Sequence, residues 1–314
     1  MTVLAGSGSG GAPERSDLGT GRTYATRAYR ELRHIQPEIV HCHAHWYTLA
    51  AGVRYSRDRP GTPLIFSFHT TVIPWLPLAF SRLLRSAKTI TFVSAAQLAE
   101  VRSALRLDGE LRILQPAIDP SPIDPIEVEQ AAIQYHLPGA FPILVFTGPL
   151  EYARKVDGVV ELVNVVRQIR VEHPRVKLLI VGDGGLRGRV EAAAAGLDDA
   201  VTVTGFLPNP KALMANADLY CHISRQEGLP IALLEAMSMA RCIVASRTGG
   251  IPEVIDDANG MLVDGEDSIA AGILQLAREP DLRIRLGTAA RQTIRQHYTW
   301  DARWPVLTSI YGLG

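Results

Sequence analysis

Short apolar runs alternate with amphipathic stretches along almost the whole chain. In the first part, the apolar runs predict strands near residues 2–5, 38–42, 63–68, 89–93 and 111–114. In the second part, they predict strands near residues 142–147, 177–181, 201–204, 219–223 and 242–245. Apolar residues at helical spacing lie between them, as in 22–35 and 95–105. Such alternation indicates the α/β class, with parallel sheets and right-handed crossovers.

The alternation breaks once, in a proline-rich segment. Residues 115–125 contain Pro116, Pro120, Pro122 and Pro125. Proline lacks the backbone N–H and fixes φ, so this segment continues neither a helix nor a central strand. A chain of 314 residues also exceeds the usual size of one core. We therefore expect an incomplete N-terminal Rossmann-like domain over residues 1–118, a second Rossmann-like domain over 119–296, and a C-terminal helix over 297–314 that packs back towards the first.

The segment after the predicted strand at 219–223 carries the densest candidate chemistry. Glu227 lies in a turn, Gly228 permits close backbone approach, and Pro230 fits a first helical turn, where its missing N–H costs nothing. The N–H groups at a helix N-terminus bind anions such as a diphosphate. Glu235 lies about 1.5 turns into this helix, where its carboxylate could accept hydrogen bonds from a ribose. The alternative, a capping Glu227 and a solvated Glu235, does not explain an acid within the apolar run ALLEAM.

This segment resembles the E-x7-E motif of retaining glycosyltransferases with the GT-B fold, in particular glycosyltransferase family 4. The resemblance continues through CIVASRTGGIPEVI and NGMLVD, and includes VGDG, VTVTGF and YTWD. It implies an α/β fold of two Rossmann-like domains facing a central cleft, with the N-terminal domain shortened. It also implies transfer of a sugar from a nucleotide-sugar (NDP-sugar) donor to a hydroxyl of a glycan or lipid-linked acceptor, with retention of configuration.

The resemblance also implies a set of site residues. The catalytic roles fall on His69, Lys155 and Glu227. The donor-binding positions are Gly148, Arg154, Lys155, Gly182, Asp183, Phe206, Glu227, Gly228, Leu229, Pro230, Ile231 and Glu235. Cations stabilise the charge that grows on the departing diphosphate, and two of them can replace a divalent ion. Since no Asp-x-Asp segment stands out, we expect no metal and no cofactor beside the nucleotide-sugar substrate.

Two features depart from the family pattern. Pro149 stands where the family usually has an arginine, so Arg154 and Lys155 are expected to share the phosphate-binding role. The family's opening strand, glycine turn and helix have no counterpart, because residues 1–6 resemble its second strand. The glycine/serine tract at 6–11 is expected to be a mobile loop. Loss of a central strand exposes sheet edges and favours self-association.

These departures leave an alternative function open. The chain could be a catalytically impaired module that still binds a nucleotide sugar or a partner protein. A sugar-nucleotide epimerase is a third reading, with less support because the E-x7-E segment and its downstream context match transferases better.

Composition and charge limit the partners and the location. The 32 basic and 32 acidic residues balance, so nothing indicates a nucleic-acid partner. Six basic residues nevertheless gather in residues 54–88, where Asp58 is the one acid: Arg54, Arg57, Arg59, Arg82, Arg85 and Lys88. They form either a solvated surface or a contact for anionic lipid headgroups or a phosphorylated acceptor. With no apolar run of roughly 20 residues and no secretory signal, we expect a cytoplasmic, in part membrane-peripheral protein.

Cysteines and histidines give little sign of a metal site. Cys42, Cys221 and Cys242 lie in apolar runs without C-x-x-C spacing, which argues against a disulfide framework and a zinc knuckle. The histidines at 41, 43 and 45 share one face of a predicted strand, but zinc sites normally draw ligands from separate segments. The family commonly carries a similar histidine run, so no metal is needed to explain it.

Overall fold

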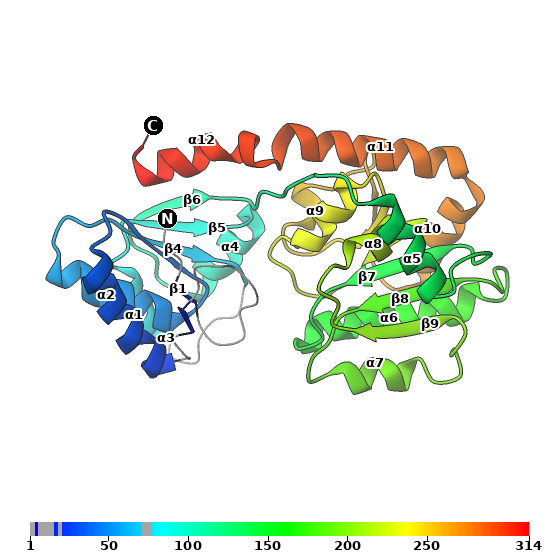
Figure 1. The fold of residues 1–314 in the computed structure, drawn as a ribbon, viewed down its shortest axis with the longest axis horizontal. Coiled ribbons are helices and arrows are strands. Elements are labelled where there is room, and N and C mark those ends of the chain that lie inside the picture. The colour runs from blue at the N-terminus through cyan, green and yellow to red at the C-terminus, as the bar shows by residue number, and fades with distance from the viewer. Residues whose placement is uncertain (1–3, 6–15, 18–20, 71–76, 314) are drawn as a thin grey trace. The chain divides into compact units, whose positions relative to one another are not determined.

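The apolar runs form parallel strands in a computed structural model that describes residues 4–5, 16–17, 21–70 and 77–313 (Figure 1). The chain divides into two units. The first comprises Met1–Gln115 together with Pro305–Gly314, and the second comprises Pro116–Trp304. The boundary after Gln115 lies at the start of the proline-rich segment.

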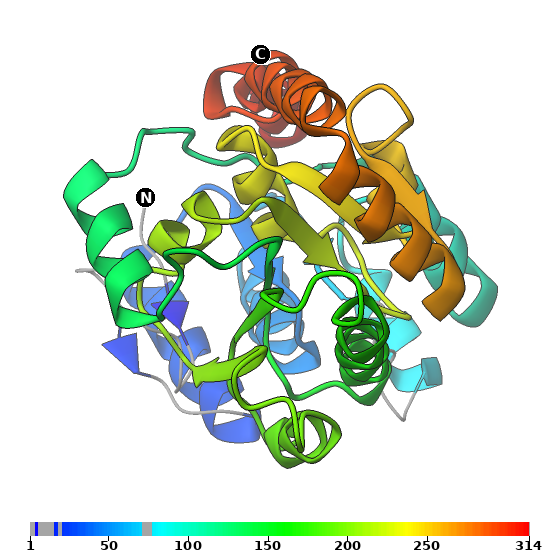
Figure 2. The ribbon, with the colours of Figure 1, turned by 90° about the vertical axis from the view of Figure 1, so that its right-hand side faces the viewer.

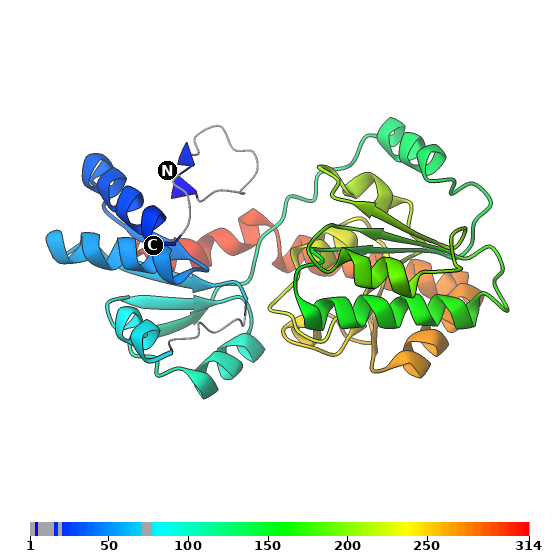
Figure 3. The same ribbon diagram turned by 90° about the horizontal axis from the view of Figure 1, so that it is seen from below.

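The first unit contains a four-stranded parallel sheet among its described residues, in the order β3, β4, β5, β6. These strands are Val40–His43, Leu64–Phe68, Thr89–Phe92 and Glu110–Ile113. The helices of this unit are α1 (Gly21–Ile35), α2 (Trp46–Asp58), α3 (Pro77–Leu84) and α4 (Ala95–Ala104), and α1 packs on α2 (Figure 3). Its core joins aliphatic and aromatic side chains of helices and strands, including Leu49, Phe66, Phe80, Leu84 and Phe92.

The expected strand near residues 2–5 is present only in part. Strand β1 (Leu4–Ala5) pairs with β2 (Ser16–Asp17) in a separate two-stranded sheet. Within the described residues it does not join the four-stranded sheet, as the family's second strand would be expected to do. Residues 1–3 and the glycine/serine tract at 6–11 lie outside the described residues.

The second unit contains a six-stranded parallel sheet in the order β12, β11, β10, β7, β8, β9. In chain order these strands are β7 (Ile143–Thr147), β8 (Lys177–Val181), β9 (Val201–Gly205), β10 (Leu219–His222), β11 (Cys242–Ser246) and β12 (Met261–Val263). The chain builds outward from β7 through β8 to β9, then returns to place β10 on the other side of β7. The reversal between β7 and β10 is a topological switch point, where doubly wound sheets bind ligands at their carboxyl ends.

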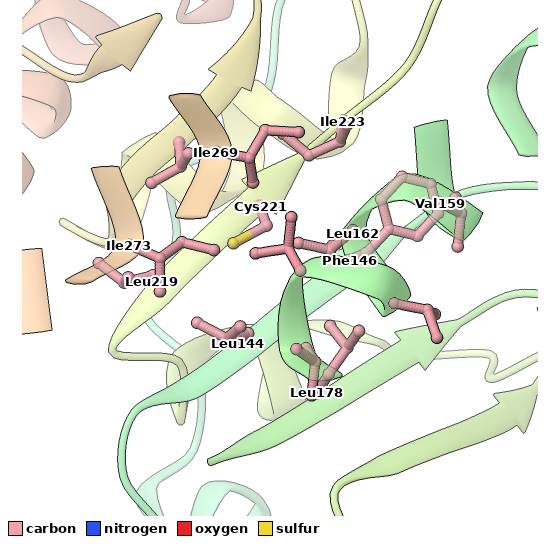
Figure 4. Packing of buried hydrophobic residues seen from close by; sticks show 14 of the residues in the cluster. Leu144, Phe146, Val159, Leu162, Leu178, Leu219, Cys221, Ile223, Ile269 and Ile273 are labelled. Carbon is pink, nitrogen blue, oxygen red and sulfur yellow. The ribbon is translucent and has the colours of Figure 1, made fainter. Parts of the chain in front are cut away.

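Helices cover both faces of this sheet (Figure 2). One face packs against α6 (Ala153–Ile169), α7 (Arg187–Ala193) and α10 (Glu266–Arg278). The other carries α8 (Lys211–Ala215), α9 (Ile231–Ser238) and α11 (Pro280–His297), with α5 (Pro125–Gln134) packed on α8. In the core, the strand residues Leu144, Phe146 and Cys221 meet Leu162 and Ile273 of the helices (Figure 4). A dry, close-packed layer of this kind fixes the strand ends that carry the candidate site.

The aromatic residues of helix α12 (Trp300–Tyr311) differ in their exposure. Its three large aromatic residues, Trp300, Trp304 and Tyr311, would be natural apolar contacts for a helix that packs on the rest of the protein. The two tryptophans are instead 56% and 57% exposed, while Tyr311 is partly buried and its hydroxyl lies 2.9 Å from His41 Nδ1. The tyrosine is therefore the aromatic residue of α12 that makes a specific polar contact within the first unit.

All three cysteines lie in the interior of the protein. Cys42, Cys221 and Cys242 are free and buried, so they pack as small apolar side chains. No helix in the part of the chain that the structure describes has the length and apolar character needed to cross a membrane.

Candidate active site

The loops that follow β7 and β10 meet the switch point of the second sheet. Leu219 and Tyr220 of β10 pair with Leu144 and Val145 of β7, so the two strands end at the same edge. Gly148 directly follows β7, and the loop with Glu227 follows β10. The sequence-predicted residues Gly148 and Glu227 are thus on neighbouring strand ends, although they are far apart in the chain.

The loop from Ser224 to Gly228 is held by several hydrogen bonds. The backbone N–H of Ser224 donates to Ser246 Oγ at 3.0 Å, and the Ser224 hydroxyl donates to the carbonyl of Gln226 at 3.1 Å. The N–H of Gly250 donates to the Gly228 carbonyl at 2.7 Å. Gly249 has a φ of +52°, and a Cβ there would lie 2.0 Å from the Glu227 carbonyl oxygen. A glycine is therefore required where this second loop touches the first.

The carboxylate of Glu227 is buried and doubly paired. Its Oε1 lies 3.0 Å from Lys155 Nζ and 3.0 Å from His222 Nε2, and its side chain is 7% exposed. Burial raises the pKa of Glu227, but the charge and hydrogen bonds of His222 and Lys155 outweigh burial and lower the pKa to about 2. The carboxylate is therefore ionised at neutral pH.

Lys155 and Arg154 differ sharply in their surroundings. Lys155 lies in the first turn of α6 and its side chain is 13% exposed, whereas Arg154 beside it is exposed. The N-terminus of a helix carries partial positive charge, which disfavours a cation there. The negative charge of the Glu227 carboxylate compensates for this unfavourable interaction at Lys155. The geometry brings Lys155, and not Arg154, to the acid. Whether the two cations share the phosphate-binding role stays a prediction.

Sequence reasoning missed a row of polar residues behind Glu227. His222 is 1% exposed, and its Nδ1 lies 3.4 Å from the hydroxyl of Tyr220. The Tyr220 hydroxyl lies 2.8 Å from Thr147 Oγ1. The available signal was the polar histidine within the otherwise apolar strand LYCH, two residues from the tyrosine and therefore on the same face of β10.

Gly182 and Asp183 form a turn that touches the Gly148 turn. A Cβ at Gly182 would lie 1.9 Å from the Gly148 carbonyl oxygen, and the N–H of Gly148 donates to the Val181 carbonyl at 3.0 Å. The Asp183 carboxylate accepts the N–H of Gly184 at 2.8 Å and lies 3.4 Å from Arg187 Nη1. The close contact between the two turns therefore leaves no room for a side chain at residue 182, whether or not a ligand binds there. Direct contact of Gly182 and Asp183 with a donor stays a prediction.

The start of α9 presents backbone donors and a partly buried acid. Pro230 occupies its N-cap, where a proline ring accepts no hydrogen bond, so the first N–H groups of α9 are available to an anion. Leu229 is buried and Ile231 is 54% exposed. Glu235 lies 3.7 Å from Lys211 Nζ, and burial raises the pKa of Glu235 while Lys211 opposes the rise.

Two further predicted residues are Phe206 and His69. Phe206 follows β9 and is 74% exposed, which leaves its ring face open for a flat group to stack on. His69 belongs to the first unit, where its Nε2 lies 2.8 Å from His43 Nδ1. Burial and the neighbouring His43 and His69 lower the pKa of His41 to about 3, so that ring is neutral at neutral pH. Among the described residues, no group of three or more His, Cys, Asp or Glu is arranged to hold a metal ion.

The paired Glu227 should make part of the stability depend on pH. Because its pKa is lower in the folded protein, its contribution is present above its ordinary pKa near 4.5 and is lost as the pH falls towards 2. We expect wild type to exceed Glu227→Gln in free energy of unfolding by on the order of 2 kcal/mol at pH 7. Urea unfolding at pH 7, 5 and 3 measures the difference, which should shrink only below pH 5. A difference that is equal at all three pH values would contradict the pairing.

Comparison with known proteins shows which families and which folds the chain is similar to. A family model described as "Glycosyl transferases group 1" matches residues 141–279, and one described as "Glycosyltransferase Family 4" matches residues 7–122. A GDP-mannose-dependent alpha-(1-6)-phosphatidylinositol monomannoside mannosyltransferase of Mycobacterium tuberculosis is 29% identical over 281 residues, covering 82% of this chain and 72% of the relative. A GDP-mannose-dependent monoacylated alpha-(1-6)-phosphatidylinositol monomannoside mannosyltransferase of Corynebacterium glutamicum is 24% identical over 288 residues, covering 84% and 75%.

Solved structures share the fold at lower identity. The structure of HepE from Anabaena in complex with UDP-glucose superposes with a TM-score of 0.82 at 17% identity, covering 95% of this chain and 86% of that one. The likeness confirms the α/β architecture of two parallel sheets that the sequence predicted.

Proposed function

We propose that this chain, which belongs to glycosyltransferase family 4 and has the GT-B fold, moves a sugar from a nucleotide-sugar donor to a hydroxyl acceptor with retention of configuration. The observation that carries the proposal is the buried Glu227 carboxylate paired with Lys155 at the switch point of the second sheet. Its relatives are named as transferases, which supports catalysis over the alternative of an impaired binding module.

In this proposal the second unit contacts three parts of the donor: its diphosphate, its nucleoside and its sugar. Lys155 and the first N–H groups of α9 bind the diphosphate, since both supply positive charge at a partly buried position. Glu235 accepts hydrogen bonds from the ribose hydroxyls, and Phe206 offers a face to the base. Glu227 accepts a hydrogen bond from a hydroxyl of the transferred sugar. The contribution of His69 from the first unit stays a prediction.

The chemical step then needs no separate base. The bond between the anomeric carbon and the diphosphate oxygen breaks, and a bond from that carbon to the acceptor oxygen forms on the same face. The acceptor proton passes to an oxygen of the leaving diphosphate. Lys155 and the α9 N-terminus stabilise the negative charge that develops on this leaving group, which lowers the barrier.

We further propose a nucleoside diphosphate hexose as donor and a lipid-linked or glycan hydroxyl as acceptor. GDP-mannose is the first candidate, because two relatives are named as GDP-mannose-dependent. UDP-glucose is the second, because it occupies HepE. The basic residues between 54 and 88 would suit an acceptor with an anionic headgroup at a membrane surface.

A donor panel tests this proposal. Thermal-shift measurements with UDP-, GDP- and ADP-sugars should give a raised melting temperature for one nucleotide class, since a ligand that binds only the folded state stabilises it. Transfer is then assayed with the hit and with lipid-linked and glycan acceptors. If no nucleotide sugar raises the melting temperature and none is turned over, the proposed function is wrong.

Replacing Glu235 by alanine should raise the KM for the donor by about tenfold to a hundredfold, with a smaller change in kcat. The reason is that a ribose contact binds the ground state and the transition state equally. Steady-state kinetics with the donor from the panel provide the measurement. As a control, Glu172→Ala removes an exposed acid that is also paired with a cation, Arg278, and should leave both constants unchanged. Full donor turnover with an unchanged KM in Glu235→Ala would disprove the ribose assignment.

A further inference from the structure

Glu227 has a second partner that the reaction described above does not use. His222 Nε2 lies 3.0 Å from Glu227 Oε1, the same oxygen that Lys155 Nζ approaches at 3.0 Å. An ionised carboxylate only accepts hydrogen bonds, so the Nε2 that faces it must carry a hydrogen whether or not the ring is charged. Both partners end on Oε1, and among the described residues no partner is recorded for Oε2. This leaves Oε2 for a sugar hydroxyl.

The histidine is itself held from behind. Its Nδ1 lies 3.4 Å from the Tyr220 hydroxyl, which lies 2.8 Å from Thr147 Oγ1. All three side chains are buried, with exposures of 1% for His222, 0% for Tyr220 and 5% for Thr147. The Tyr220 hydroxyl also lies 3.5 Å from the Thr147 carbonyl, which is a second acceptor for its proton. When Tyr220 donates to Nδ1 and Thr147 donates to Tyr220, each hydroxyl donates once and the ring presents Nε2–H to Glu227. The strands β7 and β10 therefore supply the side chains that contact the ring on the side away from Glu227.

This arrangement matters when the donor binds. A diphosphate on Lys155 would draw the ammonium away from Glu227. With Lys155 as its one partner, the carboxylate would then remain buried, charged and unpaired, which is costly in a protein interior. That cost would oppose donor binding. A second hydrogen-bond donor on the same oxygen removes most of it.

We propose that His222 is a positioning residue that keeps Glu227 paired and oriented while Lys155 shifts its ammonium to the donor diphosphate. The inference rests on the proposed function for the identity of the ligand. It goes beyond that function by assigning a role to a buried strand residue that does not touch the donor. Glu227 sets which ring nitrogen carries the hydrogen, and Thr147 and Tyr220 hold the ring from behind.

The test uses the nucleoside diphosphates GDP and UDP without a sugar, so that the contact between Glu227 and the sugar does not contribute. Calorimetry compares wild type with His222→Gln, His222→Leu and the double variant His222→Leu/Glu227→Gln. Glutamine can place an N–H near the position of Nε2, whereas leucine cannot. We expect His222→Leu to bind about tenfold more weakly and His222→Gln to bind close to wild type.

The double variant separates this role from a purely structural one. Glu227→Gln removes the charge that retains Lys155, so it should restore binding of the diphosphate in the His222→Leu background to within about threefold of wild type. A structural role for His222 predicts no such rescue. Equal binding by wild type and His222→Leu, or a double variant as weak as His222→Leu, would overturn the proposal.

A measurement without ligand tests the proposal where a variant fails to fold or where neither nucleotide binds. In the full-length wild-type protein, the imidazole N–H of His222 should be observed by nitrogen-15 NMR at Nε2 and protected from exchange, and the protection should fall in Glu227→Gln. A neutral ring protonated at Nδ1 overturns the inference, even where His222→Leu fails to fold. If wild type binds neither GDP nor UDP, the proposed donor class is wrong, and the NMR result alone decides the role of His222.

Discussion

Replacing Lys155 by alanine will lower kcat for sugar transfer by about two to three orders of magnitude. Its Nζ lies 3.0 Å from Glu227 Oε1 and its side chain is 13% exposed. Negative charge grows on the diphosphate as the glycosidic bond breaks, and an ammonium in a partly buried site stabilises that charge more than one in water. The substitution also leaves Glu227 with His222 as its one recorded partner. Steady-state kinetics with the donor from the panel measure the loss.

A neighbouring ion pair supplies the control for Lys155. Arg189 Nη2 lies 2.8 Å from Asp157 Oδ1, but the Arg189 side chain is 48% exposed. Solvent-exposed ion pairs contribute little to the stability of a protein, so Arg189→Ala should keep kcat within about twofold of wild type. Arg154→Ala should lose less than Lys155→Ala, because Arg154 is exposed. If Arg154→Ala shows the large loss and Lys155→Ala keeps its activity, the phosphate-binding role belongs to Arg154.

Replacing Gly249 by alanine should lower transfer activity by about a hundredfold, although residue 249 need not touch the substrate. The new Cβ would lie 2.0 Å from the carbonyl oxygen of Glu227, which no real contact tolerates, so the Glu227 loop must move. A shift of about 1 Å in a catalytic group has an effect of this size. The measurements are kcat and the melting temperature.

Gly265 is the matched control for this substitution. Its φ is also positive, at +78°, but a Cβ there meets nothing within 4 Å. With a ψ of 163°, Gly265 has a backbone conformation that is essentially restricted to glycine, so Gly265→Ala carries a conformational cost of about 1–3 kcal/mol without a steric clash and should keep full activity. A Gly249→Ala protein with the melting temperature and the activity of Gly265→Ala would show that the two loops do not depend on their contact.

Much of the fold could be predicted because the strand signal is local. The predicted strand at 177–181 is found with the same bounds, and the strands near 143–147 and 242–246 differ by one residue at one end. Helix α2 was given no bounds, and strand β12 was not predicted. Helix α2 follows the histidine run without a capping side chain, and its pattern of small residues, AAGV, gives a weak helical period. Strand β12 has three residues, too few for a period to be recognised.

The candidate site was predictable only where the resemblance or a local motif pointed to it. The E-x7-E segment pointed to Glu227 and Glu235, and the structure has Glu227 in the loop before α9 and Glu235 within this helix. The partners of these acids come from elsewhere in the chain: Lys155 from α6, His222 and Tyr220 from β10, and Lys211 from α8. Contacts between strands that are adjacent in the sheet but not in sequence leave no periodic signal, so these pairings required the structure.

The contact between Tyr311 and His41 has a consequence for how the protein is made. The two residues are separated by 270 positions, and Arg112 likewise donates to Ser309 at 3.2 Å. Residues 116–304 form their unit from one continuous stretch, whereas the first unit also includes residues 305–314. During synthesis the second unit can therefore finish folding while the first, begun earlier, still awaits its final segment. A truncation within residues 305–311 would damage the unit that was translated first.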